Sequence, residues 1–296
     1  MTAQQAKQMV KNALYRSIGE TSTTLRLTPE AGELLRVLMY HKVNDIPDNP
    51  TTVPVARFAE QLDTLAELGY QVVGLQTVLD RYTHELPLPE KAVLITFDDG
   101  YRDTLDNALP LLQSHGFPAV IFVPVAFLDG EMPLPHESHL VERGMRNPTL
   151  DWGLMRELDA GGVRVESHGI AHRPLAEVSL DESVREIAVS KLKLEENLAR
   201  PVTAYAYVKG SEANFHPVHE SILKQAGYQI AFTSISRSNG PHANPFRLGR
   251  YNVEPYSVRT FELVLSGACD LISLKDTVAG THARRLFNQA LGTSTR

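Results

Sequence analysis

Short apolar runs and segments with helical spacing alternate along most of the chain. Residues 92–97 and 119–123 are continuous strand-forming runs, whereas 55–68 repeats apolar residues at helical spacing and ends before Gly69. The same alternation predicts the other strands at 34–40, 71–74, 163–167, 203–207, 229–233 and 246–253, and the other helices at 75–82, 101–115, 149–160, 180–198, 220–226, 258–265 and 275–289. Strands and helices that alternate with short connections are typical of parallel sheets. The pattern therefore predicts an α/β fold, a distorted (β/α)7-8 barrel.

Two segments stand outside this alternation. Residues 4–17 have apolar positions near helical spacing, which predicts an amphipathic helix that packs on the domain or, alternatively, contacts a membrane surface or a partner. Residues 124–147 are rich in Pro, Gly and His, and an insertion at the carboxyl end of a strand is expected to shape a substrate rim. We expect an N-terminal extension over 1–33 and a single catalytic domain over 34–296.

Composition narrows the possible partners. The 296 residues carry a formal charge of −6, which lacks the basic excess of a nucleic-acid-binding protein. The only cysteine, Cys269, cannot form an internal disulfide or a thiolate cluster, so a metal site would use His and carboxylate. No stretch approaches the roughly 20 apolar residues of a transmembrane segment, and no secretory signal is recognisable. The expected location is cytoplasmic, with contact at a membrane surface left open and the oligomeric state undetermined.

Two adjacent carboxylates follow the most apolar predicted strand. Asp98, Asp99 and Gly100 come directly after residues 92–97, so both acids would lie at the carboxyl end of a buried strand. Ligands of α/β sheets bind at that end. The alternative is an ordinary strand-to-helix turn, in which Asp and Gly are common.

A pair of histidines follows another predicted strand. His168 and His172 are four residues apart, a spacing that can direct both imidazoles at one point, although such pairs also occur on surfaces and at helix caps. Together with the carboxylates Asp98 and Asp99 they would form a site of two histidines and one carboxylate. Such a site suits zinc or another divalent first-row ion and leaves positions open for water and substrate.

These two motifs resemble a known family. Residues 96–100, Thr-Phe-Asp-Asp-Gly, and residues 167–172, Ser-His-Gly-Ile-Ala-His, are similar to the NodB-homology polysaccharide deacetylases of carbohydrate esterase family 4. The resemblance covers about residues 36–253 and implies a distorted barrel with a divalent metal. Residues 38–43, Leu-Met-Tyr-His-Lys-Val, resemble the branch that deacetylates poly-N-acetylglucosamine, in which the catalytic histidine precedes the Asp-Asp motif.

The resemblance implies a role for each matching residue. Asp98 would be the general base, and Asp99, His168 and His172 would bind the metal, whose activated water attacks the amide. His41 would be the general acid; a strand-end histidine bonded to backbone is the alternative.

Two further residues follow from the same resemblance. Tyr207 would donate a backbone N–H to the oxyanion, and Arg250 would pair with the base carboxylate unless it forms only a surface salt bridge. Trp152 matches a family position and could be core or a sugar-stacking platform.

Some residues depart from the family pattern. Gly169 stands where Ser or Thr is usual, Ala206 replaces a proline, and Val208 and Lys209 displace a glycine. These changes leave the expected metal ligands in place but affect the oxyanion site and the substrate groove.

The sequence thus predicts a metal-dependent deacetylase, with zinc as the expected ion, that removes an N-acetyl group from an acetamido sugar of a polysaccharide or glycoconjugate. The alternatives are an O-acetyl esterase, a deformylase or a non-sugar amide hydrolase of the same fold, or a degenerate protein that binds glycan without turnover.

Overall fold

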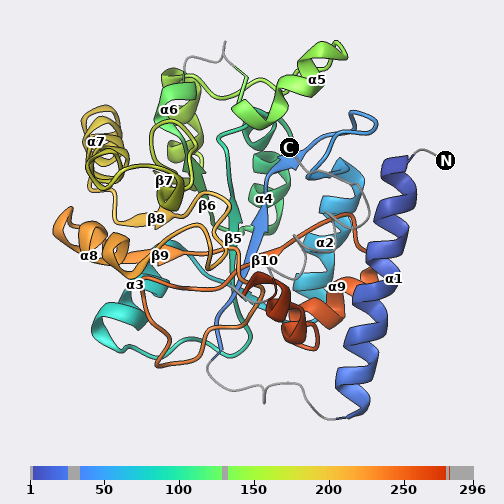
Figure 1. The fold of residues 1–296 in the computed structure, drawn as a ribbon. Helices are drawn as coiled ribbons and strands as arrows, with labels where there is room; N and C mark the ends of the chain where they lie inside the picture. The colour runs from blue at the N-terminus through green and yellow to red at the C-terminus, as the bar shows by residue number, and fades with distance from the viewer. Residues whose placement is uncertain (1–2, 26–33, 129–132, 278–279, 281–296) are drawn as a thin grey trace.

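The computed structural model describes residues 3–25, 34–128, 133–277 and 280 (Figure 1). Parallel strands form one curled sheet, a half-barrel, in the order β10 (Tyr251–Asn252), β1 (Arg36–Tyr40), β5 (Ala92–Phe97), β6 (Ala119–Val123), β7 (Val163–Ser167), β8 (Ala204–Ala206) and β9 (Ile230–Phe232). The short strand β4 (Gln71–Val72) pairs in parallel with the start of β5. The predicted α/β fold is confirmed.

Helices surround this sheet (Figure 1). They are α2 (Val55–Glu67), α3 (Leu75–His84), α4 (Leu109–His115), α6 (Trp152–Ala160), α7 (Leu180–Leu198), α8 (Pro217–Gln225) and α9 (Val258–Leu265). Short helical turns are η2 (Val125–Phe127), η3 (Pro135–Glu137), η4 (Leu175–Glu177) and η5 (Asp270–Asp276), with α5 (Ser138–Glu142) after η3. The helix predicted at 275–289 lies mostly outside the described residues. None of the helices in the described part of the chain is long and apolar enough to cross a bilayer.

Alternation along the strands divides the core into two clusters. The side chains on one face of β5, including Ile95 and Phe97, pack with side chains of the surrounding helices, such as Phe58 and Leu62 of α2. The alternate set, including Leu94, packs with side chains of α3 and of the neighbouring strands. On β5 this second set continues with the polar residues Thr96 and Asp98 at the carboxyl end of the strand.

The predicted strand at 246–253 is shorter than expected, because only Tyr251–Asn252 form a ladder, with β1. The preceding residues run beside β9 through a single bridge between Phe232 and Leu248. Their ladder is interrupted because the Asn239 side chain hydrogen-bonds to both backbone groups of Gly249. Asn239 Oδ1 accepts from the Gly249 N–H at 2.7 Å, and Asn239 Nδ2 donates to the Gly249 carbonyl at 2.9 Å. This segment therefore connects β9 to β1 and carries Arg250 to the site between them.

The predicted helix at 101–115 forms in two parts. It begins as a π-helical turn, η1 (Thr104–Ala108), and continues as α4. Pro110 has no N–H to donate to the carbonyl of Asp106, and a wider turn before a proline accommodates this loss.

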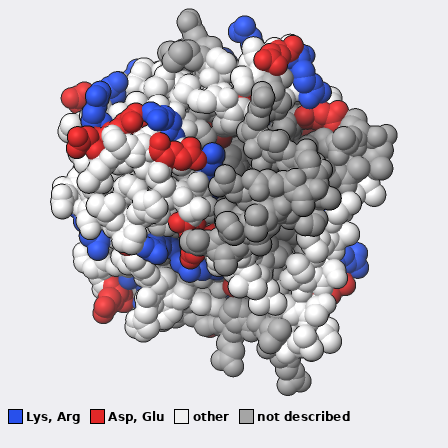
Figure 2. All heavy atoms as spheres, viewed as in Figure 1, with Lys and Arg blue, Asp and Glu red and all other residues white. Residues whose placement is uncertain are grey.

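The predicted N-terminal helix is longer than expected. Helix α1 (Ala3–Thr24) packs along α9, with the rings of Tyr15 and Tyr256 5.3 Å apart. A Cβ at Gly19 would lie 2.9 Å from Leu263, so a glycine permits this close approach. Acidic and basic side chains are interspersed on the described part of the face drawn in Figure 2.

Candidate active site

A cavity of about 890 Å³ lies at the carboxyl ends of β1, β5 and β7. All seven predicted site residues line it: His41, Asp98, Asp99, His168, His172, Tyr207 and Arg250. Six of them lie at the carboxyl end of a strand or in the segment after it, because parallel strands direct their carboxyl ends to the same side of a sheet. The seventh, Arg250, immediately precedes β10. The structure thus brings together residues up to 209 positions apart in the sequence, from 41 to 250.

Asp98 is buried and held by Arg250 through two parallel bonds. Guanidinium Nη1 donates to Oδ1 at 2.7 Å and Nη2 donates to Oδ2 at 2.8 Å. Arg250 is itself fixed because its Nε donates to the Thr233 carbonyl at 2.9 Å. Burial alone would raise the pKa of Asp98, but Arg250 and His168 outweigh it, so the pKa lies below its ordinary value. Asp98 is therefore an ionised and oriented carboxylate.

Asp99 points its carboxylate at the two histidines because of an unusual backbone turn. Its φ is 75°, and Gly100 follows with φ 73°, so the strand bends sharply after Asp98. A left-handed conformation is rare for a residue other than glycine, and such residues often occur at functional sites. Asp99 Oδ1 lies 2.9 Å from His172 Nε2 and 3.6 Å from His168 Nε2.

The Asp99, His168 and His172 side chains fit a divalent metal. One ligand atom from each lies within 4.8 Å of the others. Asp99 Oδ1 is buried, and the two imidazole Nε2 atoms lie within 3.6 Å of it. Nδ1 of His168 lies 2.8 Å from the Ala206 carbonyl, an arrangement that orients Nε2 toward Asp99. Burial lowers the pKa of His168 to about 4, so its imidazole is neutral at pH 7 and can bind a metal.

The loop between the two histidines is braced by a residue of α7. Glu186 Oε2 accepts hydrogen bonds from the N–H groups of Ile170, at 2.6 Å, and Ala171, at 3.1 Å. Gly169 has φ 82°, and a Cβ there would lie 2.9 Å from Glu186 Oε2. The glycine that departs from the family pattern therefore makes room for this carboxylate, which orders the loop that carries His172.

His41 and Tyr207 follow β1 and β8, the strands on either side of β5, β6 and β7 in the sheet. His41 follows β1 and lines the cavity with Asp98 and Asp99. Tyr207 follows β8, and its N–H donates to the Phe232 carbonyl at 3.0 Å. The backbone group predicted to meet an oxyanion is therefore engaged with β9 in this structure.

The structure also places a residue at the site that the sequence did not assign a role. His136 of η3 has its Nε2 3.6 Å from Asp99 Oδ2 and 3.1 Å from the Tyr101 hydroxyl. The adjacent Glu137 is buried and pairs with Lys42 at 2.8 Å. The only feature of the sequence that pointed to His136 was the His-containing insertion at 124–147. The Lys42–Glu137 ion pair holds this insertion beside the site.

Trp152 is not among the described residues that line this cavity. It begins α6 and packs against the core cluster. Of the two roles considered from the sequence, the structure favours the core.

Comparison with known proteins identifies a family. Residues 85–231 match the family model described as polysaccharide deacetylase. The chain is 28% identical over 258 residues to YxkH of Bacillus subtilis, which is named as a polysaccharide deacetylase; the match covers 86% of this chain and 84% of that protein. It is 38% identical over 85 residues to the poly-β-1,6-N-acetyl-D-glucosamine N-deacetylase of Escherichia coli K12, over 28% of this chain and 13% of that protein.

Solved structures share the fold. IcaB from Ammonifex degensii superposes with a TM-score of 0.66 at 25% identity and covers 80% of this chain and 98% of its own. The Streptococcus pyogenes deacetylase PplD, solved with acetate, superposes with a TM-score of 0.67 at 21% identity, over 78% of this chain and 98% of its own.

Proposed function

The chain carries a domain of the polysaccharide deacetylase family, and on this premise we propose that it is a metal-dependent N-deacetylase of an acetamido sugar in a glycan. The observation that carries the proposal is the meeting of Asp99, His168 and His172 around one point, beside a carboxylate held ionised by Arg250. The match to the E. coli N-deacetylase favours a polymer of N-acetylglucosamine as the substrate class.

In this proposal Asp99, His168 and His172 hold the metal. Two imidazoles and one carboxylate suit zinc, although other divalent first-row ions are compatible. When bound, the ion would polarise the amide carbonyl and lower the pKa of water.

Two groups of the chain would move the protons. Asp98 would accept the proton of the attacking water, because its lowered pKa keeps it ionised and each carboxylate oxygen keeps a lone pair beyond its bond to Arg250. His41 would donate a proton to the departing amine, because it lines the cavity with both carboxylates. The products would be acetate and the free amine of the sugar.

Tyr207 stays a prediction as the oxyanion donor. Its N–H would have to exchange the Phe232 carbonyl for the oxyanion, since that carbonyl now accepts the hydrogen bond.

Acetate release tests this function. The purified protein, loaded with zinc, should release acetate from a β-1,6-linked N-acetylglucosamine pentamer. Asp98→Asn should lower kcat by about a thousandfold, a typical loss for a proton-transfer group, while zinc content measured by atomic emission stays stoichiometric. Asp181→Asn, at an exposed position in the first turn of α7, is the matched control and should retain full activity.

Other products would distinguish the alternatives. Release of formate, or of acetate from O-acetyl esters alone, would replace the N-deacetylase with another hydrolase of the same fold. Glycan binding without release of any acyl group would indicate a degenerate binding protein.

Two further expectations belong to this proposal. Residues 34–296 would act as the catalytic domain, and residues 1–33 would form an extension whose helix α1 packs on it. Cytoplasmic location remains a prediction that cell fractionation tests.

A further inference from the structure

His136 brings an imidazole from the insertion to the edge of the candidate metal site. Its ring centre lies 5.1 Å from that of His172, and its Nε2 lies 3.6 Å from Asp99 Oδ2. It lines the same cavity as Asp98 and Asp99. None of the roles proposed above falls to this side chain.

The two carboxylate oxygens of Asp99 face different partners. Oδ1 lies 2.9 Å from His172 Nε2 and 3.6 Å from His168 Nε2, whereas Oδ2 lies 3.6 Å from His136 Nε2. The contact to His136 is longer than a hydrogen bond, so it acts through the attraction between a negative oxygen and a polar N–H. This attraction holds Oδ2 on the side of the insertion and leaves Oδ1 facing the two other histidines.

The hydrogen bonds of Tyr101 show which His136 nitrogen carries a proton. The Tyr101 hydroxyl donates to Glu137 Oε1 at 3.0 Å and lies 3.1 Å from His136 Nε2. A hydroxyl has one proton to donate, so toward His136 it can only accept. Nε2 of His136 is therefore the protonated nitrogen. A protonated nitrogen has no lone pair for a metal, so in this arrangement His136 Nε2 is a donor beside Asp99 and not a fourth ligand.

A buried ion pair fixes the direction of these hydrogen bonds. Lys42 Nζ donates to Glu137 Oε1 at 2.8 Å and lies 5.0 Å from the centre of the Tyr101 ring. A carboxylate paired with a lysine accepts and does not donate. The Tyr101 proton is therefore directed at Glu137, and the Tyr101 oxygen stays available to the His136 N–H.

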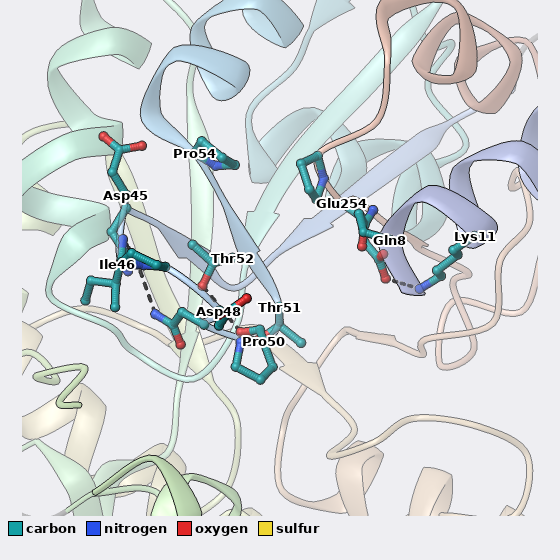
Figure 3. Close-up of a pocket in the computed structure, with 14 residues that line it drawn as sticks. Gln8, Lys11, Asp45, Ile46, Asp48, Pro50, Thr51, Thr52, Pro54 and Glu254 are labelled. Atoms are coloured by element: carbon teal, nitrogen blue, oxygen red, sulfur yellow. Dashed lines mark hydrogen bonds and ion pairs between the residues drawn. The ribbon is translucent and has the colours of Figure 1, made fainter. Parts of the chain in front are cut away.

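The segment after β2 (Lys42–Val43) keeps Lys42 in place. It leads to β3 (Thr52–Val53) and forms one wall of a second cavity, of about 460 Å³ (Figure 3). Within it Asn49 Oδ1 accepts from Lys42 Nζ at 2.9 Å, and Asn49 Nδ2 donates to Asn147 at 2.7 Å. The insertion and the segment after β2 thus hold the same lysine.

We propose that His136 is a positioning residue of the metal site, whose Nε2–H holds Asp99 Oδ2 so that Oδ1 meets the ion together with His168 and His172. The inference rests on the proposed function for the presence of the ion. It adds that the insertion, through His136, sets how tightly the ion is bound. Donors behind the ligands of a metal orient those ligands, and their loss typically costs about 10–100-fold in metal affinity.

Zinc affinity tests the inference. The dissociation constant for zinc is measured on the full-length, metal-free protein by competition with a chelator. His136→Ala should raise it by at least about tenfold. His136→Gln should recover most of the affinity, since its amide N–H can replace the Nε2–H. His242→Ala, which removes an exposed imidazole between β9 and β10, is the matched control and should bind zinc as the unmodified protein does.

Cobalt absorption distinguishes a positioning residue from a ligand. The visible spectrum of bound cobalt(II) changes when a ligand is lost or replaced. At saturating cobalt, the spectrum of His136→Gln should match that of the unmodified protein, because the ion keeps its three protein ligands. A changed spectrum in His136→Gln would show that His136 binds the ion itself and would overturn the inference.

The variants should keep their fold because the His136 side chain is 43% exposed. The melting temperatures of the metal-free proteins check this. Unchanged zinc affinity in His136→Ala would overturn the inference.

Zinc binding separates this inference from the proposed function, because it is measured without turnover. If no protein releases acetate but His136→Ala binds zinc more weakly than His136→Gln, the proposed function fails and the inference stands. If acetate is released and His136→Ala binds zinc as tightly as the unmodified protein, the inference fails alone. Absence of zinc binding in the unmodified protein would overturn both.

Discussion

Arg250 controls the charge of Asp98. The carboxylate is buried, which by itself raises its pKa, and the bidentate guanidinium reverses this effect. Because a general base acts only when ionised, the pair sets the lower pH limit of activity.

Arg250→Met should therefore move the acidic limb of the kcat profile to higher pH, by about one unit or more, because burial would then dominate the pKa of Asp98. Arg250→Lys should restore only part of the shift, since lysine keeps the charge but not the two parallel bonds. The measurement is kcat between pH 4 and 9. A limb that stays at the same pH in Arg250→Met would show that the guanidinium does not set the pKa of the base.

Asp103 links stability to pH. It accepts hydrogen bonds from Val43 N–H, at 3.2 Å, and Asn44 Nδ2, at 2.5 Å, yet burial raises its pKa from 3.8 to about 6. Between pH 4 and 6 the folded protein holds a proton that the unfolded chain releases. This group's contribution to stability is therefore present at low pH and is lost as the pH rises through about 6.

Asp103→Asn should remove this loss because its side chain does not ionise. The free energy of unfolding of the variant, relative to the unmodified protein, should rise by about 2–3 kcal/mol between pH 4 and pH 7. Urea unfolding at both pH values measures it. If the variant and the unmodified protein differed in free energy of unfolding by the same amount at both pH values, the raised pKa of Asp103 would be contradicted.

At the level of elements, a buried ion pair attaches the insertion to the short strand β2, which follows β1. Lys42 of β2 and Glu137 of η3 are 1% and 2% exposed and 2.8 Å apart. Glu137 Oε1 also accepts from Asn147 and Tyr101. Because His41 and His136 are the neighbours of this pair in the sequence, the pair fixes two sides of the cavity at once.

Lys42→Met should destabilise the protein by about 3–5 kcal/mol, because it leaves the Glu137 carboxylate buried without a counter-ion. The double variant Lys42→Met with Glu137→Met should lose clearly less than the sum of the two single losses. Chemical unfolding of the four proteins gives this coupling energy. Additive losses would mean that the two side chains act independently.

The regular elements were largely predictable from the sequence. β5, β6, β7, α7 and α9 have the bounds that the apolar pattern predicts. Their signal is local, since a buried strand or an amphipathic helix carries its periodicity in its own residues. The prediction of a strand failed for the segment before β10. There the side chain of Asn239, ten residues away, forms the hydrogen bonds to the Gly249 backbone that a neighbouring strand would otherwise form.

The candidate site was predictable only where a motif marks it. The carboxylates and histidines after β5 and β7 could be paired because parallel strands end at the same side of the sheet. The position of His136 and the pairing of Lys42 with Glu137 could not be predicted. No local pattern of residues indicates where an irregular insertion packs.

At the scale of the whole molecule, the candidate metal site connects distant parts of the chain. Asp99 follows β5, whereas His168 and His172 follow β7, and β6 lies between these strands. An ion held by all three would bind the folded state alone, since the unfolded chain does not bring them together. Metal binding should therefore stabilise the whole fold.

Removal of the metal should lower the melting temperature as well as abolish activity. With zinc at 100 times its dissociation constant, the free energy of unfolding should rise by about 2.7 kcal/mol, which corresponds to about 4–5 °C in melting temperature for a chain of this size. Calorimetric melting of chelator-treated protein, before and after zinc is restored, measures the shift. His172→Ala should abolish it, whereas His84→Ala, whose side chain is 68% exposed on α3, should retain it. An equal shift in both variants would place the stabilising ion elsewhere and remove the support that the meeting of Asp99, His168 and His172 gives to a hydrolase.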